Sequence, residues 1–235
     1  MCIRDRAGAS VLEIGCGTGT STVALCEQKS RVTAVDVNRD SMEVAKSRLH
    51  AYGLTAEFIH INAAHLLEAF PEQRFDFILY FASLEHMSFE ERIQSLRAAF
   101  KMLTTNGYVV LIETPNRLWY FDGHTSLEPF YHWLPNDVAM AYAKFTRREN
   151  FKRGFDAASE RDISRFVRWG RGVSYHELEI ALDGRDKIQV ASSLHAFLEL
   201  PDSHFKKTLR LLGPEDVHES FYEDNLNLAL KSPHT

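Results

Sequence analysis

The segment that most constrains the fold of this chain is VLEIGCGTGTSTVAL, residues 11–25. An apolar run leads into three glycines at alternate positions, Gly15, Gly17 and Gly19, and a helix-forming stretch follows them. Glycine allows a backbone to turn tightly and to approach a ligand closely. The segment therefore predicts the first strand, turn and helix of a doubly wound α/β sheet, with a ligand beside the turn.

Apolar runs and helical patterns alternate from residue 9 to about residue 113, as in a parallel sheet covered by helices. The runs do not alternate polar with apolar residues, which is expected of strands buried on both faces. The expected strands are Ser10–Ile14, Arg31–Asp36, Glu57–Ile61, Phe75–Phe81 and Tyr108–Glu113. The expected helices are Asp40–Tyr52 and Phe89–Leu103, and Ser88 and Glu91 have capping-box spacing before the second.

After Glu113 the regular alternation of apolar runs and helical patterns ends. We predict one domain over residues 1–235, with a cofactor-binding core at 9–113, a helical and aromatic substrate lid at 114–173 and two further strands within 174–235. The lid is expected to contain helices at Asn136–Phe145 and at about Ala157–Trp169. The last two strands are expected at Tyr175–Leu182 and Asn225–Lys231, with a helix near Ser203–Leu212 between them.

Composition limits the class of protein. The chain has 235 residues and a formal net charge of −5, which fits one globular domain and disfavours a dedicated nucleic-acid binder. Its cysteines, Cys2, Cys16 and Cys26, lack metal-ligand spacing, and we assign no metal ligands. There is no signal peptide or membrane-length apolar run, so we expect a cytoplasmic bacterial protein. The opening MCIRDR runs almost directly into a core strand, and we expect native residues to be missing before it.

Two carboxylates flank the glycine loop. Asp36 ends the second strand and can accept hydrogen bonds from both ribose hydroxyls of a nucleoside. Glu13 lies beside the loop, giving E-x-G-x-G-x-G in place of the G-x-G-x-x-G of dinucleotide-binding folds. A carboxylate there repels a pyrophosphate and suits a cationic ligand that carries an amino acid. A nicotinamide-dependent oxidoreductase is therefore the less favoured alternative.

With these residues, 9–113 resembles the class I S-adenosylmethionine-dependent methyltransferases. The resemblance implies a Rossmann-like sheet of order 3-2-1-4-5-7-6 with an antiparallel seventh strand. It implies S-adenosylmethionine as cofactor, with the loop against the methionine part and Asp36 on the ribose. The candidate cofactor contacts are Glu13, Gly15, Cys16, Gly17, Asp36, Val37, Asn62, Ala63 and Phe81. Asn62 stands where the family usually has aspartate, and an amide oxygen can still accept from an adenine amino group.

The run Leu84-Glu85-His86 looks like the L-E-H motif of a subgroup that acts on small molecules, quinones and sugars. The N/D-P-P-Y motif of enzymes that methylate amino groups of nucleic acids is absent from this position. The resemblance therefore favours a small-molecule or sugar acceptor over a nucleic acid.

The segment FDGHTSLEPFYHWLP, residues 121–135, crowds aromatic residues, histidines and prolines into a stretch without helix or strand periodicity. It follows the fifth strand, so it lies at the sheet edge where ligands bind in such folds. We predict an acceptor pocket, and the alternative is a hydrophobic cluster that fastens the insertion. A hydroxyl acceptor needs a base, for which His86, His124 and His132 are the candidates. The candidate acceptor contacts are Glu113, Asn116, Arg117, Trp119, Tyr120 and Trp133.

Residues 144–171 hold nine basic and four acidic side chains, which indicates either a solvated surface or an anionic acceptor. The leading hypothesis is O-methylation of a small molecule or sugar precursor. An N-methyltransferase and a methyltransferase-like binding protein without turnover remain the alternatives.

Overall fold

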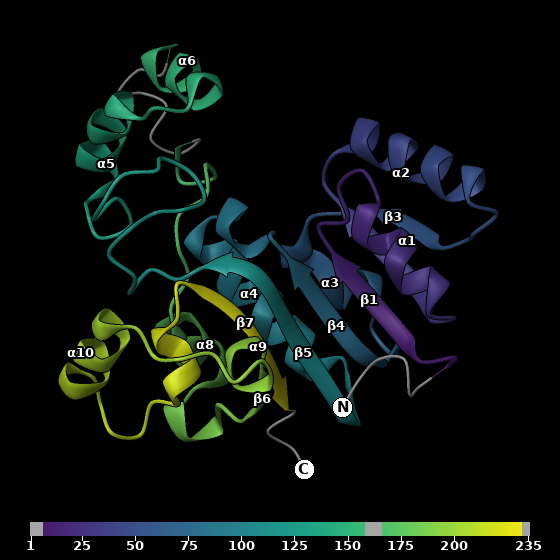
Figure 1. Ribbon diagram of the computed structural model, residues 1–235. Helices are drawn as coiled ribbons and strands as arrows, with labels where there is room; N and C mark the ends of the chain where they lie inside the picture. The colour runs from purple at the N-terminus through teal and green to yellow at the C-terminus, as the bar shows by residue number, and fades with distance from the viewer. Residues whose placement is uncertain (1–6, 158–165, 232–235) are drawn as a thin grey trace.

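The computed structural model describes residues 7–157 and 166–231. Seven strands form one sheet in the order β3-β2-β1-β4-β5-β7-β6, as predicted. β1 to β5 pair in parallel, and β7 runs antiparallel to both of its neighbours (Figure 1). The strands are β1 (Ser10–Ile14), β2 (Arg31–Asp36), β3 (Glu57–His60), β4 (Phe75–Phe81), β5 (Leu103–Pro115), β6 (Val190–Ser193) and β7 (Asn225–Lys231).

Both faces of the sheet are buried. In β1, Val11 belongs to a core cluster shared with α1 (Thr20–Glu27) and α2 (Arg39–Ala51), whereas Leu12 belongs to a cluster shared with α4 (Phe89–Lys101). Two buried faces explain why the strand sequences do not alternate polar and apolar residues. The doubly wound α/β fold predicted from the sequence is therefore confirmed.

The helices predicted from local signals begin close to their expected residues. Ser88 and Glu91 form the complete capping box at the start of α4, and Asn38 caps α2. α10 (His204–Leu212) is capped by Ser203. A cap is read from residues within one turn, so its position can be predicted without knowledge of the tertiary structure.

One predicted strand is wrong. The segment predicted as the sixth strand is the helix α8 (Tyr175–Leu182), which starts at a capping box formed by Ser174 and Glu177. Its apolar residues suit a helical stripe, and the helix packs against α4. The sixth strand is instead the short edge strand β6. β5 also starts earlier than predicted, directly after α4.

The chain between β5 and α8 forms an insertion at the carboxyl ends of the parallel strands (Figure 1). It contains α5 (Asn136–Tyr142), a 3₁₀ turn (Ala143–Phe145) and α6 (Glu149–Ala157). The first two confirm the helix predicted at Asn136–Phe145. The helix predicted from about residue 157 to 169 lies mostly outside the described residues. The insertion has its own small apolar core, formed by Tyr131, Ala139, Met140, Ala143 and Phe166.

After the insertion the chain passes through α8, a 3₁₀ turn (Arg185–Lys187), β6, α9 (Leu194–Phe197), α10, a second 3₁₀ turn (Glu219–Tyr222) and β7. The remaining helix of the core is α3 (Leu66–Ala69). Among the described residues, we find no helix with the length and apolar character that a bilayer crossing requires.

Candidate active site

A cleft of about 280 Å³ opens at the carboxyl ends of β1 and β2. Six of the nine predicted cofactor contacts line it: Gly15, Gly17, Asp36, Val37, Asn62 and Ala63. Five further residues that line the cleft were not predicted as cofactor contacts: Ala82, Ser83, Met87, Glu91 and Arg168. His86, predicted as a candidate base, also lines it.

Asp36 ties the glycine loop to the end of β2. Its Oδ2 atom accepts from the Gly17 amide at 2.7 Å, and its Oδ1 atom accepts from the Asn38 amide at 2.8 Å. Beside Gly17 the space is open, since a Cβ atom there would meet nothing within 4 Å. The loop thus leaves room for a ligand close to the backbone, with a carboxylate at its edge.

Glu13, Cys16 and Phe81 do not line the cleft, although the sequence predicted that they would contact the cofactor. Glu13 is fully buried, and its carboxylate accepts hydrogen bonds from the hydroxyls of Ser21 and Thr22 in α1. Burial raises the pKa of Glu13, against the effect of those hydrogen bonds. Burial, together with the nearby carboxylates, raises the pKa of Cys16 to about 12, so its thiol is inert. The hydrogen bonds of Glu13 to Ser21 and Thr22 hold α1 against the glycine loop.

The far wall of the cleft is closed by the insertion. The Arg168 guanidinium makes a two-pronged contact with the Glu91 carboxylate, at 2.7 and 2.8 Å. Asn62 donates to the same carboxylate at 2.8 Å, and its own Oδ1 accepts from the Ala64 amide. Burial would raise the pKa of Glu91, but the hydrogen bonds from Arg168, Asn62 and Ser88 outweigh it and lower the pKa to about 2. Glu91 is thus anionic and holds the insertion against the core.

Replacing Gly15 with alanine is expected to destabilise the protein more than the same change at Gly53. Both glycines have positive φ, at 80° and 66°, which costs an alanine about 1–2 kcal/mol. A Cβ atom on Gly15 would also lie 2.6 Å from the Ser83 Cβ atom, whereas one on Gly53 would meet nothing within 4 Å. Thermal unfolding of the two variants compares these costs. Equal melting temperatures would show that the loop tolerates the clash by moving.

At the mouth of the cleft, His86 and His124 lie together, with ring centroids 5.7 Å apart. His86 Nδ1 is 3.0 Å from the Arg168 carbonyl oxygen, which can only accept, so Nδ1 carries the proton. His124 Nδ1 is 3.1 Å from the Thr125 hydroxyl. That hydroxyl already donates to the Gly170 carbonyl, so it accepts from His124. In the neutral form of each ring, Nε2 is therefore left with its lone pair.

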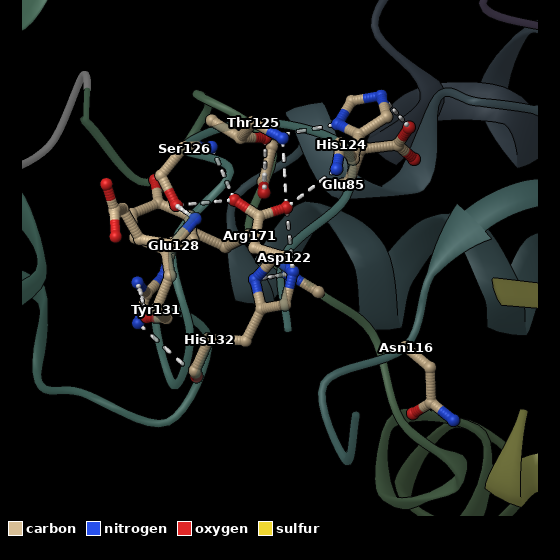
Figure 2. A network of polar contacts seen from close by, with 12 residues as sticks. Glu85, Asn116, Asp122, His124, Thr125, Ser126, Glu128, Tyr131, His132 and Arg171 are labelled. Atoms are coloured by element: carbon tan, nitrogen blue, oxygen red, sulfur yellow. Dashed lines mark hydrogen bonds and ion pairs between the residues drawn. The ribbon is translucent and has the colours of Figure 1, made fainter. Parts of the chain in front are cut away.

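Glu85 faces these two nitrogens. Figure 2 shows its contact with His124. Its Oε1 atom lies 3.5 Å from His124 Nε2 and 4.0 Å from His86 Nε2. The side chain is fully buried, and neither carboxylate oxygen has a hydrogen-bond partner among the described residues. Burial raises the pKa of Glu85 to about 7, against the lowering effects of its own main-chain amide and of Arg92, and Glu113 adds a smaller increase.

His132 has a structural role, which contradicts its prediction as a base. Its Nδ1 accepts from the Gly172 amide at 3.0 Å, and its Nε2 lies 3.3 Å from Asp122 Oδ1. Asp122 is the centre of the network in Figure 2, where it also accepts from the amides of His124, Thr125 and Ser126. Burial opposes ionisation of Asp122, but His132 and the amides lower its pKa overall. His132 thus has no nitrogen left for an acceptor.

The predicted acceptor contacts do not share one environment. Arg117 and Trp133 line a second cavity, of about 460 Å³. Asn116 is buried and donates to the carbonyls of Phe221 and Glu223, away from the Asp122 network (Figure 2). The remaining three do not line a described cavity: Trp119 and Tyr120 pack edge-on against Phe205 of α10, and Glu113 is exposed at β5.

The hydrophobic-cluster alternative accounts for part of the aromatic segment. Tyr131 is fully buried against Phe166 and belongs to the core of the insertion. Phe121, Phe130 and Trp133 are each about half exposed. The segment therefore fastens the insertion with one ring and presents the others at the surface.

Two basic side chains of residues 144–171, Arg148 and Arg171, donate hydrogen bonds to main-chain carbonyls inside the insertion. Arg171 is buried and donates to the carbonyls of Tyr131 and Leu134, while Arg148 donates to that of His124. Four others are exposed: Lys144, Arg147, Lys152 and Arg153. Two more basic positions, 161 and 165, lie outside the described residues.

The core is similar in sequence to known proteins. Residues 11–107 match a family model described as a methyltransferase domain. Ubiquinone biosynthesis O-methyltransferases from Pseudomonas fluorescens (strain Pf0-1) and Pseudomonas entomophila (strain L48) are 33% and 32% identical over 111 residues, 47% of this chain. The match covers 46% of each, so the chain spans about half the length of these curated relatives.

One solved structure aligns with almost the whole chain. It is a TehB-like SAM-dependent methyltransferase from Corynebacterium glutamicum, with a TM-score of 0.54 and 14% identity over 98% of this chain and 85% of the other. Identity at that level supports the fold alone. Residues 11–107 are therefore similar to a methyltransferase domain, and the chain as a whole shares the doubly wound, Rossmann-like fold of that solved structure.

Proposed function

We propose that the protein is an S-adenosylmethionine-dependent methyltransferase that methylates an oxygen atom of a small molecule or sugar precursor. The observation that carries the proposal is one cleft with a glycine loop and Asp36 at one end and two histidines with available lone pairs at its mouth. Residues 114–173 act in this proposal as the lid that brings His124 to the cofactor cleft.

The residues of the cleft fit the cofactor. Each oxygen of Asp36 accepts only one amide, so both retain capacity for a ribose hydroxyl. The open space beside Gly17 suits the amino-acid part, and Asn62 and Ala63 would flank the base. When bound, S-adenosylmethionine supplies an electrophilic methyl group on a sulfonium.

The mouth of the cleft supplies the chemistry that an oxygen acceptor needs. Methyl transfer is an in-line displacement, so holding the acceptor in line supplies much of the rate. A hydroxyl group must also lose its proton, and a histidine with a free lone pair can take it. His124 Nε2 has that lone pair, and Thr125 fixes the orientation of its ring. Arg117 in the second cavity would meet an anionic group on the acceptor.

Calorimetric titration with S-adenosylhomocysteine, NAD and NADP tests the cofactor. We expect micromolar binding of S-adenosylhomocysteine and none of either dinucleotide, since the loop lacks the spacing of a pyrophosphate site. Transfer of a labelled methyl group to phenolic and sugar acceptors then tests the reaction. Binding without transfer to any of them would favour the non-catalytic alternative.

His124→Gln is expected to lower kcat for methyl transfer by about 10²–10⁴-fold, the usual contribution of acid–base catalysis. Its side chain is partly exposed, so the melting temperature and the affinity for S-adenosylhomocysteine should change little. His132→Gln should instead lower the melting temperature and leave kcat nearly unchanged, because it breaks a buried contact with Asp122 and does not touch the cleft. Kinetics and thermal unfolding of both variants check the assignment, and a fully active His124→Gln would overturn it.

A further inference from the structure

Three lone-pair donors converge at the mouth of the cleft, where a general base would need only one. One carboxylate oxygen of Glu85, one ring nitrogen of His86 and one ring nitrogen of His124 all lie within 4.8 Å of one another. Glu85 and His86 belong to the 3₁₀ turn after β4 (Leu84–His86), and His124 comes from the insertion. The fold thus brings His124 next to Glu85 and His86, although it lies 38 positions after His86 in the sequence.

The Nδ1 atoms of both rings are hydrogen-bonded in the way that is typical of metal-binding histidines. A ligating histidine almost always donates its second N–H to a carbonyl, carboxylate or water, which fixes the ring and its tautomer. Here His86 donates to the Arg168 carbonyl and His124 to the Thr125 hydroxyl. Both Nε2 atoms are left facing Glu85 with lone pairs.

Glu85 is a buried carboxylate that lacks a hydrogen-bond partner among the described residues. Leaving such a group unpaired is unfavourable, and a cation beside it would offset the cost. The nearby Arg92 guanidinium donates instead to main-chain carbonyls, including those of Leu84, Glu85 and Arg171. The carboxylate therefore remains available.

A second cluster of similar composition shows the contrast. His195, Asp202 and Glu223 also lie within 4.8 Å of one another. The centre of that cluster is taken by the Lys206 ammonium, which lies 2.7 Å from Asp202, 3.4 Å from His195 and in contact with Glu223. Around Glu85, by contrast, we find no lysine or arginine donor on the carboxylate within the described residues.

We infer that Glu85, His86 and His124 bind a divalent transition-metal ion, such as Zn²⁺ or Mn²⁺, at the mouth of the cofactor cleft. Two imidazoles and one carboxylate are a donor set that such ions favour, and three protein ligands leave positions open for an acceptor. Bonds of about 2.1 Å place neighbouring donors about 3.0–3.4 Å apart. The 3.5 and 4.0 Å separations here need only a small turn of the two partly exposed rings.

The role of the ion rests on the proposed function, whereas its binding does not. An acceptor hydroxyl bound to the ion would release its proton to solvent more readily. Its oxygen would then form the new bond to carbon as the carbon–sulfur bond breaks and S-adenosylhomocysteine leaves. His124 would act in that case as a ligand, and its loss would still reduce the rate.

The test uses the full chain without a histidine tag, stripped with EDTA and titrated with CoCl₂. Visible absorption of bound Co²⁺ reports its ligands, and ZnCl₂ is added as competitor. We expect one Co²⁺ per chain, bound with micromolar affinity and displaced by Zn²⁺. Affinity should fall at least tenfold in His86→Ala, His124→Ala and Glu85→Gln, and remain unchanged in His195→Ala, from the cluster that Lys206 fills.

Circular dichroism establishes that each variant is folded. A stripped wild-type chain that binds no Co²⁺, or variants at Glu85, His86 and His124 that bind it as tightly as the wild type, would overturn the inference. S-adenosylhomocysteine titration of the same stripped protein tests the proposed function separately, because it probes Asp36 and the glycine loop, whereas Co²⁺ binding probes Glu85, His86 and His124.

Discussion

Asp36→Ala is expected to weaken S-adenosylhomocysteine binding by more than about 100-fold while the protein remains folded. The carboxylate has two tasks, since it accepts from the Gly17 amide in the glycine loop and faces the cleft where the ribose would lie. Hydrogen bonds to a charged group contribute about 1.5–3 kcal/mol each. The loss of two such bonds to the ribose therefore exceeds the roughly 2.7 kcal/mol that corresponds to 100-fold.

The matched control for this change is Asp40→Ala. Asp40 is exposed in the first turn of α2, a few residues beyond Asp36, and it does not line the cleft. Its replacement should leave the affinity within about twofold, and circular dichroism should show both variants folded. If calorimetry gives Asp36→Ala the affinity of the wild type, the cofactor does not lie in this cleft.

Arg92→Leu is expected to lower the free energy of unfolding by about 3–5 kcal/mol, as for other broken buried ion pairs. Arg92 is 4% exposed and lies 3.5 Å from the buried carboxylate of Glu177. It also donates to the carbonyls of Arg171 and Gly172, at the end of the insertion. Leucine would remove the buried cation that pairs with the Glu177 carboxylate, to which Ser174 would still donate, and it would take away the donor to these two carbonyls.

Arg97→Leu is the control for the loss of an arginine from the same helix. Its guanidinium is partly exposed and pairs with the exposed Asp183, an arrangement worth about 0–1 kcal/mol. Urea denaturation of both variants gives the comparison. A loss in Arg92→Leu no larger than in Arg97→Leu would mean that water replaces the buried contacts.

The parts of the fold that could be predicted from the sequence are those with short-range signals. Three glycines at alternate positions, the capping box at Ser88 and the apolar strand at Asn225–Lys231 all appear where they were expected. The short apolar segment Tyr175–Leu182 was predicted as a strand, although its pattern also suits a helix. The capping box of Ser174 and Glu177 is the local signal that favours the helix.

The candidate site could be predicted less completely, because its geometry depends on distant contacts. The sequence placed Glu13 beside the loop but did not show that its carboxylate faces Ser21 and Thr22. It identified His86 and His124 as separate candidates, whereas their convergence on Glu85 requires the path of the insertion. For Arg168, which closes the cleft over Glu91, the sequence contained no local sign.

The two contacts of Arg168 have a kinetic consequence. Its side chain pairs with Glu91 at the wall of the cofactor cleft, and its carbonyl oxygen orients the ring of His86. In the proposed enzyme, a motion that separates Arg168 from Glu91 to exchange the cofactor would also release that ring. Departure of S-adenosylhomocysteine and loss of the geometry on the acceptor side would then be coupled.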